Sequence, residues 1–301
     1  MDYSVFVKFC EDLGLSCKLN EPMKNHTGFK TGGNADVFVE AKDTLSLSAL
    51  LKTAKALQIP VFILGKGSNL LVSDKGIEGA VISLSDLNKI EIQGENVTAD
   101  AGTSLTALCV AVAKEGLRGL EFAYGIPGTV GGGLYMNAGA YGGEMADVVT
   151  SAEFISPDGA MGVIEKSDMA LGYRTSCFKE DGNVITKVSF KLKKGDKTEI
   201  LNKMNQLMGK RREKQPLEYP SAGSTFKRPE GHFAGALIEE CGLKGKSVGG
   251  AEVSQKHAGF VINKNGATTK DILNLMELIK NTVRENKGVE LEPEVIFVGR
   301  K

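Results

Sequence analysis

The sequence has no apolar run long enough to cross a bilayer, which would take about 20 mostly apolar residues. It also has no excess of positive charge: 37 Lys and Arg balance 37 Asp and Glu, for a formal net charge of +0. This balance excludes the broad positive field with which proteins attract nucleic acid or anionic lipid. We therefore expect no membrane insertion and no nucleic-acid partner, and any anionic ligand has to be bound by a local site.

Cysteine is scarce and scattered, and no CxxC pair occurs among Cys10, Cys17, Cys109, Cys177 and Cys241. This spacing argues against a zinc site and against a disulfide framework. His26 and His232 have no metal-type partners in the sequence, so we expect no metal. The first fifteen residues mix acidic with apolar side chains and lack the basic leader of a secretory signal. A reducing, cytoplasmic location is the expectation.

Two common nucleotide-binding motifs are missing. No G-x-x-x-x-G-K-[ST] pattern occurs, and GKGSNLL (65–71) fails the G-x-G-x-x-G test because its sixth position is Leu70. The sequence has glycine instead, at 37 of 301 positions. The usual share is about 7%, and here the glycines are clustered and not periodic. Clustering excludes collagen and solenoid repeats and favours close approach of the backbone to a ligand.

Two glycine-rich loops stand out. GKGSNLL follows an apolar run of strand type, so its amides can converge on phosphate oxygens, although a flexible hairpin turn explains it equally well. In YGIPGTVGGGLYMNAGAYG (124–142), Pro127 stiffens one corner and residues 133–136 can begin a short helix whose amides suit a pyrophosphate. Together the loops can wrap an extended dinucleotide. The alternative is that they are tight packing turns.

Apolar periodicity predicts an α+β chain with at least two lobes. Helices are expected at 45–57, 104–117, 200–215, 233–243 and 269–286, and strands at 61–64, 80–84, 150–156, 161–166, 184–195, 247–254, 259–263 and 294–298. Residues 90–102 read as a hairpin around Gly-Glu-Asn. Thr268 and Asp271 predict a capping box. We expect a domain boundary near Gly195, where charge accumulates.

The loops belong to a longer series of motifs. GKGSNLL, GIPGTVGG and MNAGAYG are joined by NHTGFKTGGNAD (25–36), LGYRTSCF (171–178), SAGSTFKRP (221–229), VSQKHAGFVIN (253–263) and LEPEVIFVG (291–299). In order and spacing the series resembles the UDP-N-acetylenolpyruvoylglucosamine reductase (MurB) family over nearly the whole chain. The resemblance implies an α+β fold: a two-part FAD-binding domain of the vanillyl-alcohol-oxidase (PCMH) type and a C-terminal α+β substrate-binding domain.

Domain boundaries follow from the resemblance. The first FAD-binding subdomain is expected at 1–84, the second at 85–195 and the substrate-binding domain at 196–290. The C-terminal strand, 291–301, is expected to join the first subdomain. No pattern in the sequence indicates an oligomeric state.

The resemblance implies three catalytic residues: Arg174 in Tyr-Arg-x-Ser, Ser224 in Gly-Ser-Thr-Phe and Glu294 in Glu-Pro-Glu-Val. The chemistry independently requires such groups. Hydride added to the β-carbon of an enolpyruvyl ether leaves negative charge that spreads into the carboxylate, which Arg174 can bind and Glu294 can share a proton with. Ser224 would protonate C2. Taken singly, Arg174 is better explained as a solvated surface charge, Ser224 as a turn former and Glu294 as a strand-edge residue. Their joint placement within matching motifs reverses this preference.

The resemblance also assigns binding residues. For FAD they are Gly65, Lys66, Gly67, Ser68, Asn69, Leu70, Gly125, Ile126, Pro127, Gly128, Thr129, Gly131, Gly132, Asn137, Ala138 and Gly139; for the substrate they are Tyr173, Lys227, Arg228 and His257. His257 could equally be a structural imidazole. FAD should be held noncovalently, because neither loop has a His or Cys placed for a covalent bond.

The implied activity is NADPH-driven reduction of UDP-N-acetylglucosamine enolpyruvate to UDP-N-acetylmuramate through FAD. Two alternatives remain: another flavin oxidoreductase of the same fold acting on a sugar or alcohol, or a noncatalytic nucleotide-binding module. The sequence departs from the family pattern at Arg228, where Asn is usual, and at Gly28 and Lys30, where Thr and Arg are usual. The short segment between Arg174 and Ser224 indicates the second subtype, which lacks a tyrosine-bearing substrate loop.

Overall fold

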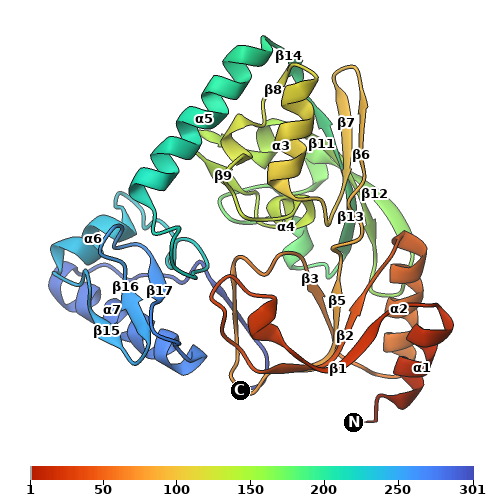
Figure 1. Ribbon diagram of the computed structural model, residues 1–301, viewed down its shortest axis with the longest axis horizontal. Helices are drawn as coiled ribbons and strands as arrows, with labels where there is room; N and C mark the ends of the chain where they lie inside the picture. Colours follow the sequence, from red (N-terminus) through yellow and green to blue (C-terminus); the bar gives the residue numbers. More distant parts are fainter. Residues whose placement is uncertain (1) are drawn as a thin grey trace. The chain divides into compact units, whose positions relative to one another are not determined.

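The computed structural model describes residues 2–301, which divide into two compact units (Figure 1). The first unit comprises residues 2–19, 37–66 and 79–210, and the second comprises 20–36, 67–78 and 211–301. The chain passes between the units five times: inside β1 (Cys17–Pro22), β2 (Asn34–Glu40), β5 (Ile77–Ser83) and α5 (Lys197–Lys214), and in the loop between Lys66 and Gly67.

The first unit contains a five-stranded antiparallel sheet in the order β12-β11-β13-β7-β6. Its strands are β6 (Ile90–Gln93), β7 (Asn96–Asp100), β11 (Val149–Ile155), β12 (Met161–Glu165) and β13 (Val184–Lys191). The β6–β7 hairpin turns at Gly94 and Glu95, which confirms the hairpin predicted around Gly-Glu-Asn. Helices α3 (Leu105–Lys114) and α4 (Val130–Tyr135) pack against this sheet (Figure 1).

A second part of this unit holds α1 (Ser4–Asp12), α2 (Thr44–Ala56) and the parallel pair β3 (Val61–Leu64) and β5. The sheet to which this pair belongs has the order β1-β2-β5-β3. Asp43 caps α2, because its carboxylate accepts the Ser46 amide at 2.7 Å while Ser46 accepts the Asp43 amide. Shorter elements are β8 (Leu117–Arg118), β9 (Gly139–Ala140), β10 (Gly143–Glu144) and β14 (Lys193–Lys194).

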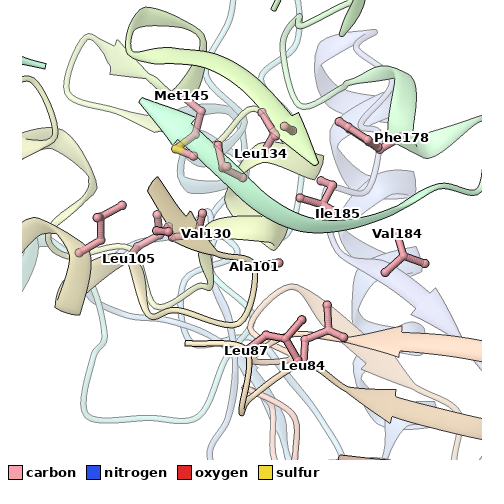
Figure 2. Close-up of a cluster of buried hydrophobic side chains, with 14 of the residues drawn as sticks. Leu84, Leu87, Ala101, Leu105, Val130, Leu134, Met145, Phe178, Val184 and Ile185 are labelled. Atoms are coloured by element: carbon pink, nitrogen blue, oxygen red, sulfur yellow. The ribbon is translucent and has the colours of Figure 1, made fainter. Parts of the chain in front are cut away.

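One apolar core runs through the first unit. Figure 2 shows part of it, where side chains converge from α3 (Leu105), α4 (Val130, Leu134) and β13 (Val184, Ile185). Leu105, Val130 and Leu134 are fully buried, and burial of each such side chain contributes about 1.5–3 kcal/mol. The short α4, with three glycines in six residues, is therefore held by packing and not by helix propensity.

The second unit has a three-stranded antiparallel sheet of β15 (Ser247–Val248), β16 (Ala251–Val253) and β17 (Val261–Asn263). Helix α7 (Thr269–Lys287) packs on this sheet and contacts α6 (Ala234–Glu240) (Figure 1). The predicted capping box is confirmed: the Asp271 amide donates to the Thr268 hydroxyl at 3.1 Å and the Thr268 amide donates to the Asp271 carboxylate at 2.9 Å.

The C-terminal strand β18 (Ile296–Val298) pairs in parallel with β4 (Leu70–Val72), and Ile296 lies opposite Leu70. Both strands belong to the second unit, and the joining of residues 291–301 to the first FAD-binding subdomain stays a prediction. In the described chain, residues 2–301, no helix has both the length and the apolar character needed to span a membrane.

The two compact units do not divide where the domain boundaries were predicted, and the functional domains at 1–84, 85–195 and 196–290 stay a prediction. The start of α5 does not coincide with a division between units, because Ile200 and Met204 of α5 are buried in the core of the first unit and the chain leaves that unit only between Lys210 and Arg211. The helix expected to begin at Gly133 begins at Val130 instead. The expected boundary at residue 84 likewise lies within the first unit.

Candidate functional site

The first glycine loop begins beside the second. Gly65 is exposed, and a Cβ atom placed on it would lie only 2.7 Å from the Thr129 hydroxyl. Thr129 is the N-cap of α4 and accepts the Gly132 amide at 3.2 Å. Two exposed glycines, Gly65 and Gly132, therefore flank one capping hydroxyl, and the surface there presents backbone without side chains.

The amides at the start of α4 are already bound within the protein. Val130 donates to the Thr103 carbonyl and Gly131 to the Ala101 carbonyl, both at 2.8 Å. A Cβ atom on Gly131 would lie 2.7 Å from that of Ala101, so Gly131 serves close packing. The expectation that amides of this helix are available for a pyrophosphate is wrong, because the capping threonine and two neighbouring carbonyls accept its first three amides.

Lys66 supplies a positive charge beside these glycines. Its ammonium donates to the Ser104 hydroxyl at 3.0 Å, and Ser104 forms an isolated antiparallel bridge with Thr129. Ser104 precedes α3 and makes no side-chain cap there. Its hydroxyl instead holds Lys66 close to Thr129, where an anionic group would meet both the ammonium and exposed backbone.

Asn137 connects the second glycine loop to the segment that carries Arg174. It is 1% exposed, and its backbone φ is +41°, a conformation that asparagine tolerates better than most residues. Its amide nitrogen donates to the Gly172 carbonyl at 3.0 Å, and its amide oxygen accepts the Ala146 amide at 2.9 Å. The buried Asn137 side chain thus joins two other segments of the first unit by hydrogen bonds.

Arg174 sits in a tight turn. Gly172 and Thr175 exchange both backbone hydrogen bonds at 3.2 Å, which leaves Tyr173 and Arg174 as the two central residues. Arg174 has φ +56°, a strained conformation for an arginine that is often found at functional sites. Its guanidinium lies 5.2 Å from the centre of the Tyr173 ring, and Lys179 donates to its carbonyl at 2.6 Å. The turn holds the arginine backbone in one orientation.

The rest of the first glycine loop belongs to the second unit. Gly67 has φ +58°, and a Cβ atom on it would lie 2.0 Å from the His26 carbonyl oxygen, so only glycine fits. The Gly28 amide donates to the Gly67 carbonyl at 3.0 Å. Gly28, where the family pattern has Thr, is equally confined, because its Cβ would lie 2.5 Å from the Ser221 carbonyl oxygen.

Ser224 and Glu294 are brought together in the second unit. Phe226 and Pro293 form an antiparallel bridge, the Glu294 amide donates to the Thr225 carbonyl at 2.8 Å, and the Lys227 amide donates to the Glu292 carbonyl at 2.8 Å. Thr225 follows Ser224 directly, so one peptide unit separates the serine from the carbonyl that holds Glu294. Ser224 is exposed and Glu294 is half-buried. The hydrogen bond between the Thr225 carbonyl and the Glu294 amide, which we call the junction at Thr225, therefore lies next to a hydroxyl residue and a carboxylate residue.

Asn69 holds Glu294 from the other side. Its side-chain amide donates to the Glu294 carbonyl at 3.1 Å, and its backbone carbonyl accepts the Ile296 amide at 2.9 Å. A residue predicted to bind flavin is thus bonded to the residue predicted to be the catalytic acid.

The four expected substrate residues differ in environment. Tyr173 belongs to the first unit and is 54% exposed. Lys227 pairs with Glu292 at 2.9 Å and holds the pKa of that carboxyl below its usual value. Arg228 lies over the exposed ring of Phe233, 4.0 Å from the ring centre. Lys227, Arg228 and His257 lie in the second unit with Ser224.

His257 is held as a neutral imidazole. Its Nδ1 accepts the Gly259 amide at 3.0 Å, and its ring packs edge-on against Phe260 with 5.1 Å between ring centres. Burial lowers the pKa of His257 below its ordinary value. Because Nδ1 is an acceptor, the proton of the neutral ring resides on Nε2, which can donate to a ligand.

These features fit a noncovalently bound dinucleotide. The exposed glycines beside Thr129 leave room for a ligand to reach the backbone, and Lys66 brings a cation to the same place. Neither loop contains a His or Cys. The residues present are thus compatible with FAD in these loops.

The sequence missed two residues that position others, Thr225 and Ser104. Each is a hydroxyl residue next to a residue that was predicted: Thr225 follows Ser224, and Ser104 lies where an N-cap is expected. Thr225 could have been identified because it follows Ser224, and Ser104 because it begins a predicted helix. Their hydrogen-bond partners come from distant segments, which the sequence does not indicate.

Two family models match the chain. Residues 215–298 match the C-terminal domain of UDP-N-acetylenolpyruvoylglucosamine reductase, and residues 35–164 match the FAD binding domain. A UDP-N-acetylenolpyruvoylglucosamine reductase of Clostridium novyi is 51% identical over 284 residues, covering 94% of this chain and 92% of the relative. The one of Clostridium botulinum strain Hall is 47% identical over 301 residues, covering 99% of this chain and 98% of the relative.

Solved structures lead to the same family. The UDP-N-acetylenolpyruvylglucosamine reductase (MurB) of Thermus caldophilus superposes with a TM-score of 0.81 at 37% identity and covers 94% of this chain and 98% of its own. An alkyldihydroxyacetonephosphate synthase, 16% identical, has a TM-score of 0.50 and covers 64% of this chain and 41% of its own, a likeness of fold alone. The expected fold class is confirmed: α+β, with an FAD-binding domain of the vanillyl-alcohol-oxidase type. The chain belongs to the UDP-N-acetylenolpyruvoylglucosamine reductase family.

Proposed function

We propose that this chain is an FAD-dependent enzyme that uses NADPH to reduce UDP-N-acetylglucosamine enolpyruvate to UDP-N-acetylmuramate, a step in the synthesis of peptidoglycan precursors. Membership of the reductase family over 94% or more of the chain supports the overall activity. The observation that carries the mechanism is the junction at Thr225, because it joins a hydroxyl residue and a carboxylate residue through one peptide unit.

The flavin has a defined place in this proposal. When bound, FAD would supply the hydride-transfer chemistry between NADPH and the enolpyruvyl substrate. The residues proposed to hold it are those of the two loops, with Gly65 and Gly132 giving access to backbone and Lys66 facing anionic oxygens. The family resemblance implies that NADPH and the enolpyruvyl substrate use the same site in turn, and on that basis we expect ping-pong kinetics.

Arg174 is proposed to bind the enolpyruvyl carboxylate. A guanidinium can form two parallel hydrogen bonds with a carboxylate, and it stabilises the negative charge that spreads there when hydride reaches the β-carbon. The strained turn and the Tyr173 ring restrict where this guanidinium can go. A guanidinium that is held in place before the reaction stabilises the transition state more effectively than a mobile one.

Ser224 and Glu294 are proposed to complete the reduction. Glu294 shares a proton or hydrogen bond with the developing aci-carboxylate, and Ser224 then delivers a proton to C2. A serine hydroxyl is a very weak acid, so it can serve here only against a carbanion-like, strongly basic partner or through a proton relay. Hydride at the β-carbon and the proton at C2 together convert the enolpyruvyl ether into a lactyl ether.

Substrate binding is assigned to Tyr173, Lys227, Arg228 and His257. A neutral His257 would donate from Nε2, while Lys227 and Arg228 supply positive charge for an anionic nucleotide sugar. We retain residues 1–84, 85–195 and 196–290 as the proposed functional domains. A reducing, cytoplasmic location is part of the proposal.

The alternatives differ in what they require. A flavin enzyme that oxidises a sugar or alcohol needs no arginine for an enolpyruvyl carboxylate and no proton donor at C2. A noncatalytic nucleotide-binding module predicts protein without flavin, or flavin that NADPH does not reduce. Both are disfavoured by relatives that match nearly the whole chain and bear the name of one reductase.

The test follows the flavin spectrum under anaerobic conditions. NADPH is expected to bleach the visible absorbance of the oxidised flavin, and the enolpyruvyl substrate is expected to restore it. Ser224→Ala should still be bleached by NADPH but recover far more slowly. Recovery with oxygen alone would leave the flavin fold in place and remove the substrate assignment.

A further inference from the structure

Thr225 stands at the meeting point of three segments in the second unit. Its amide donates to the Gly259 carbonyl at 2.9 Å, its carbonyl accepts the Glu294 amide at 2.8 Å, and its hydroxyl accepts the Val261 amide at 2.9 Å. The side chain is 0% exposed. A buried residue bonded through its amide, its carbonyl and its side chain has no freedom to shift without breaking a bond.

Glu294 is fixed by the same arrangement. Its amide is held by the Thr225 carbonyl, and its own carbonyl is held by the Asn69 side chain at 3.1 Å. The backbone of Glu294 is therefore bonded on both sides. Ser224 directly precedes Thr225, so the hydrogen bonds of Thr225 also restrict the position of the Ser224 backbone.

We propose that Thr225 is a positioning residue for the reduction, whose hydroxyl fixes the backbone of Ser224 and Glu294 relative to each other. This inference rests on the proposed roles of Ser224 and Glu294. Thr225 is 0% exposed, so the role proposed for it is positioning and not contact with the substrate. Its hydroxyl holds residues 259–261 against the junction, and that contact prevents the serine and the carboxylate from drifting apart.

The hydroxyl is the testable part. Valine has nearly the shape of threonine but no acceptor, so Thr225→Val fills the same space and leaves the Val261 amide, in a residue that is 1% exposed, without its partner. The backbone then has to move to find another acceptor. A misplacement of about 1 Å can cost about 100-fold in rate, so we expect recovery of the flavin spectrum on adding enolpyruvyl substrate to slow by roughly 10- to 100-fold.

The step that precedes substrate reduction provides an internal control. Bleaching by NADPH requires neither Ser224 nor Glu294, so Thr225→Val should bleach at a rate within about twofold of wild type. Proton delivery becomes more rate-limiting when the serine is misplaced, so the solvent deuterium isotope effect on the recovery step should rise. Thr225→Ser keeps the hydroxyl and should restore most of the recovery rate.

Thr269 offers a matched control for structural damage. It is also a buried threonine of the second unit, 1% exposed, and its hydroxyl donates to the Val72 carbonyl. Thr269→Val should lower the thermal midpoint to a similar degree without changing the recovery rate or its isotope effect. If Thr225→Val does not fold, Thr225→Ala takes its place, since water can enter the space left by the side chain.

The outcomes separate the two proposals. If wild-type flavin is not restored by the enolpyruvyl substrate, or if Ser224→Ala recovers like wild type, the proposed function or the role of Ser224 fails, and the positioning role falls with it. If Ser224→Ala is slow but Thr225→Val and Thr225→Ala both recover like wild type, the positioning role alone is overturned. It is equally overturned if Thr269→Val slows recovery as much as Thr225→Val.

Discussion

Removal of the Asn137 side chain should both destabilise the protein and slow substrate reduction. The amide of Asn137 makes two hydrogen bonds, to Gly172 at 3.0 Å and from Ala146 at 2.9 Å. Leaving a buried polar group without a partner costs about 1–3 kcal/mol, and since Gly172 and Ala146 are only half-buried, about 1 kcal/mol each applies. Alanine at φ +41° adds about 1 kcal/mol of backbone strain. Asn137→Ala should therefore lose about 3 kcal/mol of unfolding free energy.

Two further variants test the separate contributions to this loss of unfolding free energy. Asn137→Gly tolerates the positive φ but loses both hydrogen bonds, so about 2 kcal/mol is expected. Asn137→Asp keeps an acceptor for Ala146, but it places a carboxylate against the Gly172 carbonyl oxygen at a position that is 1% exposed, so about 3 kcal/mol or more is expected. The glycine variant should be the most stable of the three. Asn88→Ala, at an exposed asparagine whose amide makes one local hydrogen bond, should change stability by less than about 0.5 kcal/mol.

Urea titration at a fixed FAD concentration measures these differences, because ligand binding itself stabilises the folded state. A second measurement is flavin recovery with the enolpyruvyl substrate. Loosening the Gly172–Thr175 turn moves Arg174, so Asn137→Ala should recover about 10- to 100-fold more slowly. The reasoning would be refuted by an Asn137→Ala variant within about 0.5 kcal/mol of wild type, or by a glycine variant less stable than the alanine variant.

Three further predictions concern single sites. Gly67→Ala should lower the thermal midpoint and the flavin content of purified protein, because its Cβ would lie 2.0 Å from the His26 carbonyl oxygen; unchanged flavin absorbance would contradict this. Burial depresses the folded-state pKa of His257 below the ordinary value of 6.5, so the unfolded chain takes up the proton first, and the stability present above pH 6.5 is lost as the pH falls. Urea midpoints at about pH 7.5 and 5.5 should therefore differ more for wild type and for the control His232→Gln, at an exposed histidine, than for His257→Gln. Burial raises the pKa of Cys109 to about 12, so mass spectrometry after iodoacetamide treatment should find this thiol unmodified in the native protein and modified in urea.

Much of the fold could be predicted from the sequence, because it depends on interactions between residues that are close along the chain. The helix over 269–286 was predicted from its apolar face and its Thr268–Asp271 cap, and the structure has α7 at Thr269–Lys287 with that cap. The hairpin at 90–102 was predicted from its turn residues and alternation, and β6 and β7 pair as expected. These features depend on neighbours a few residues apart, which the sequence displays directly.

The start of α4 was missed for the opposite reason. Residues 130–135 have poor helix propensity, and the helix begins at Val130 because Thr129 caps it and because buried leucines and valines hold it in place. Its amides, expected to be available for a ligand, are taken by the carbonyls of Thr103 and Ala101. No local pattern indicates acceptors contributed from about 30 residues away, because apolar periodicity and capping signals describe only residues a few positions apart.

The sequence by itself determined the family, the residue types for the proposed chemistry and the elements with strong local signals. Tertiary structure alone decided which of these residues meet. Asn69 and Glu294 are joined by a hydrogen bond of 3.1 Å although 225 residues separate them, and Thr225 joins Gly259, Val261 and Glu294 at one point. The physical reason is burial. A polar group removed from water needs a hydrogen-bond partner, and the tertiary fold decides which distant residue supplies it.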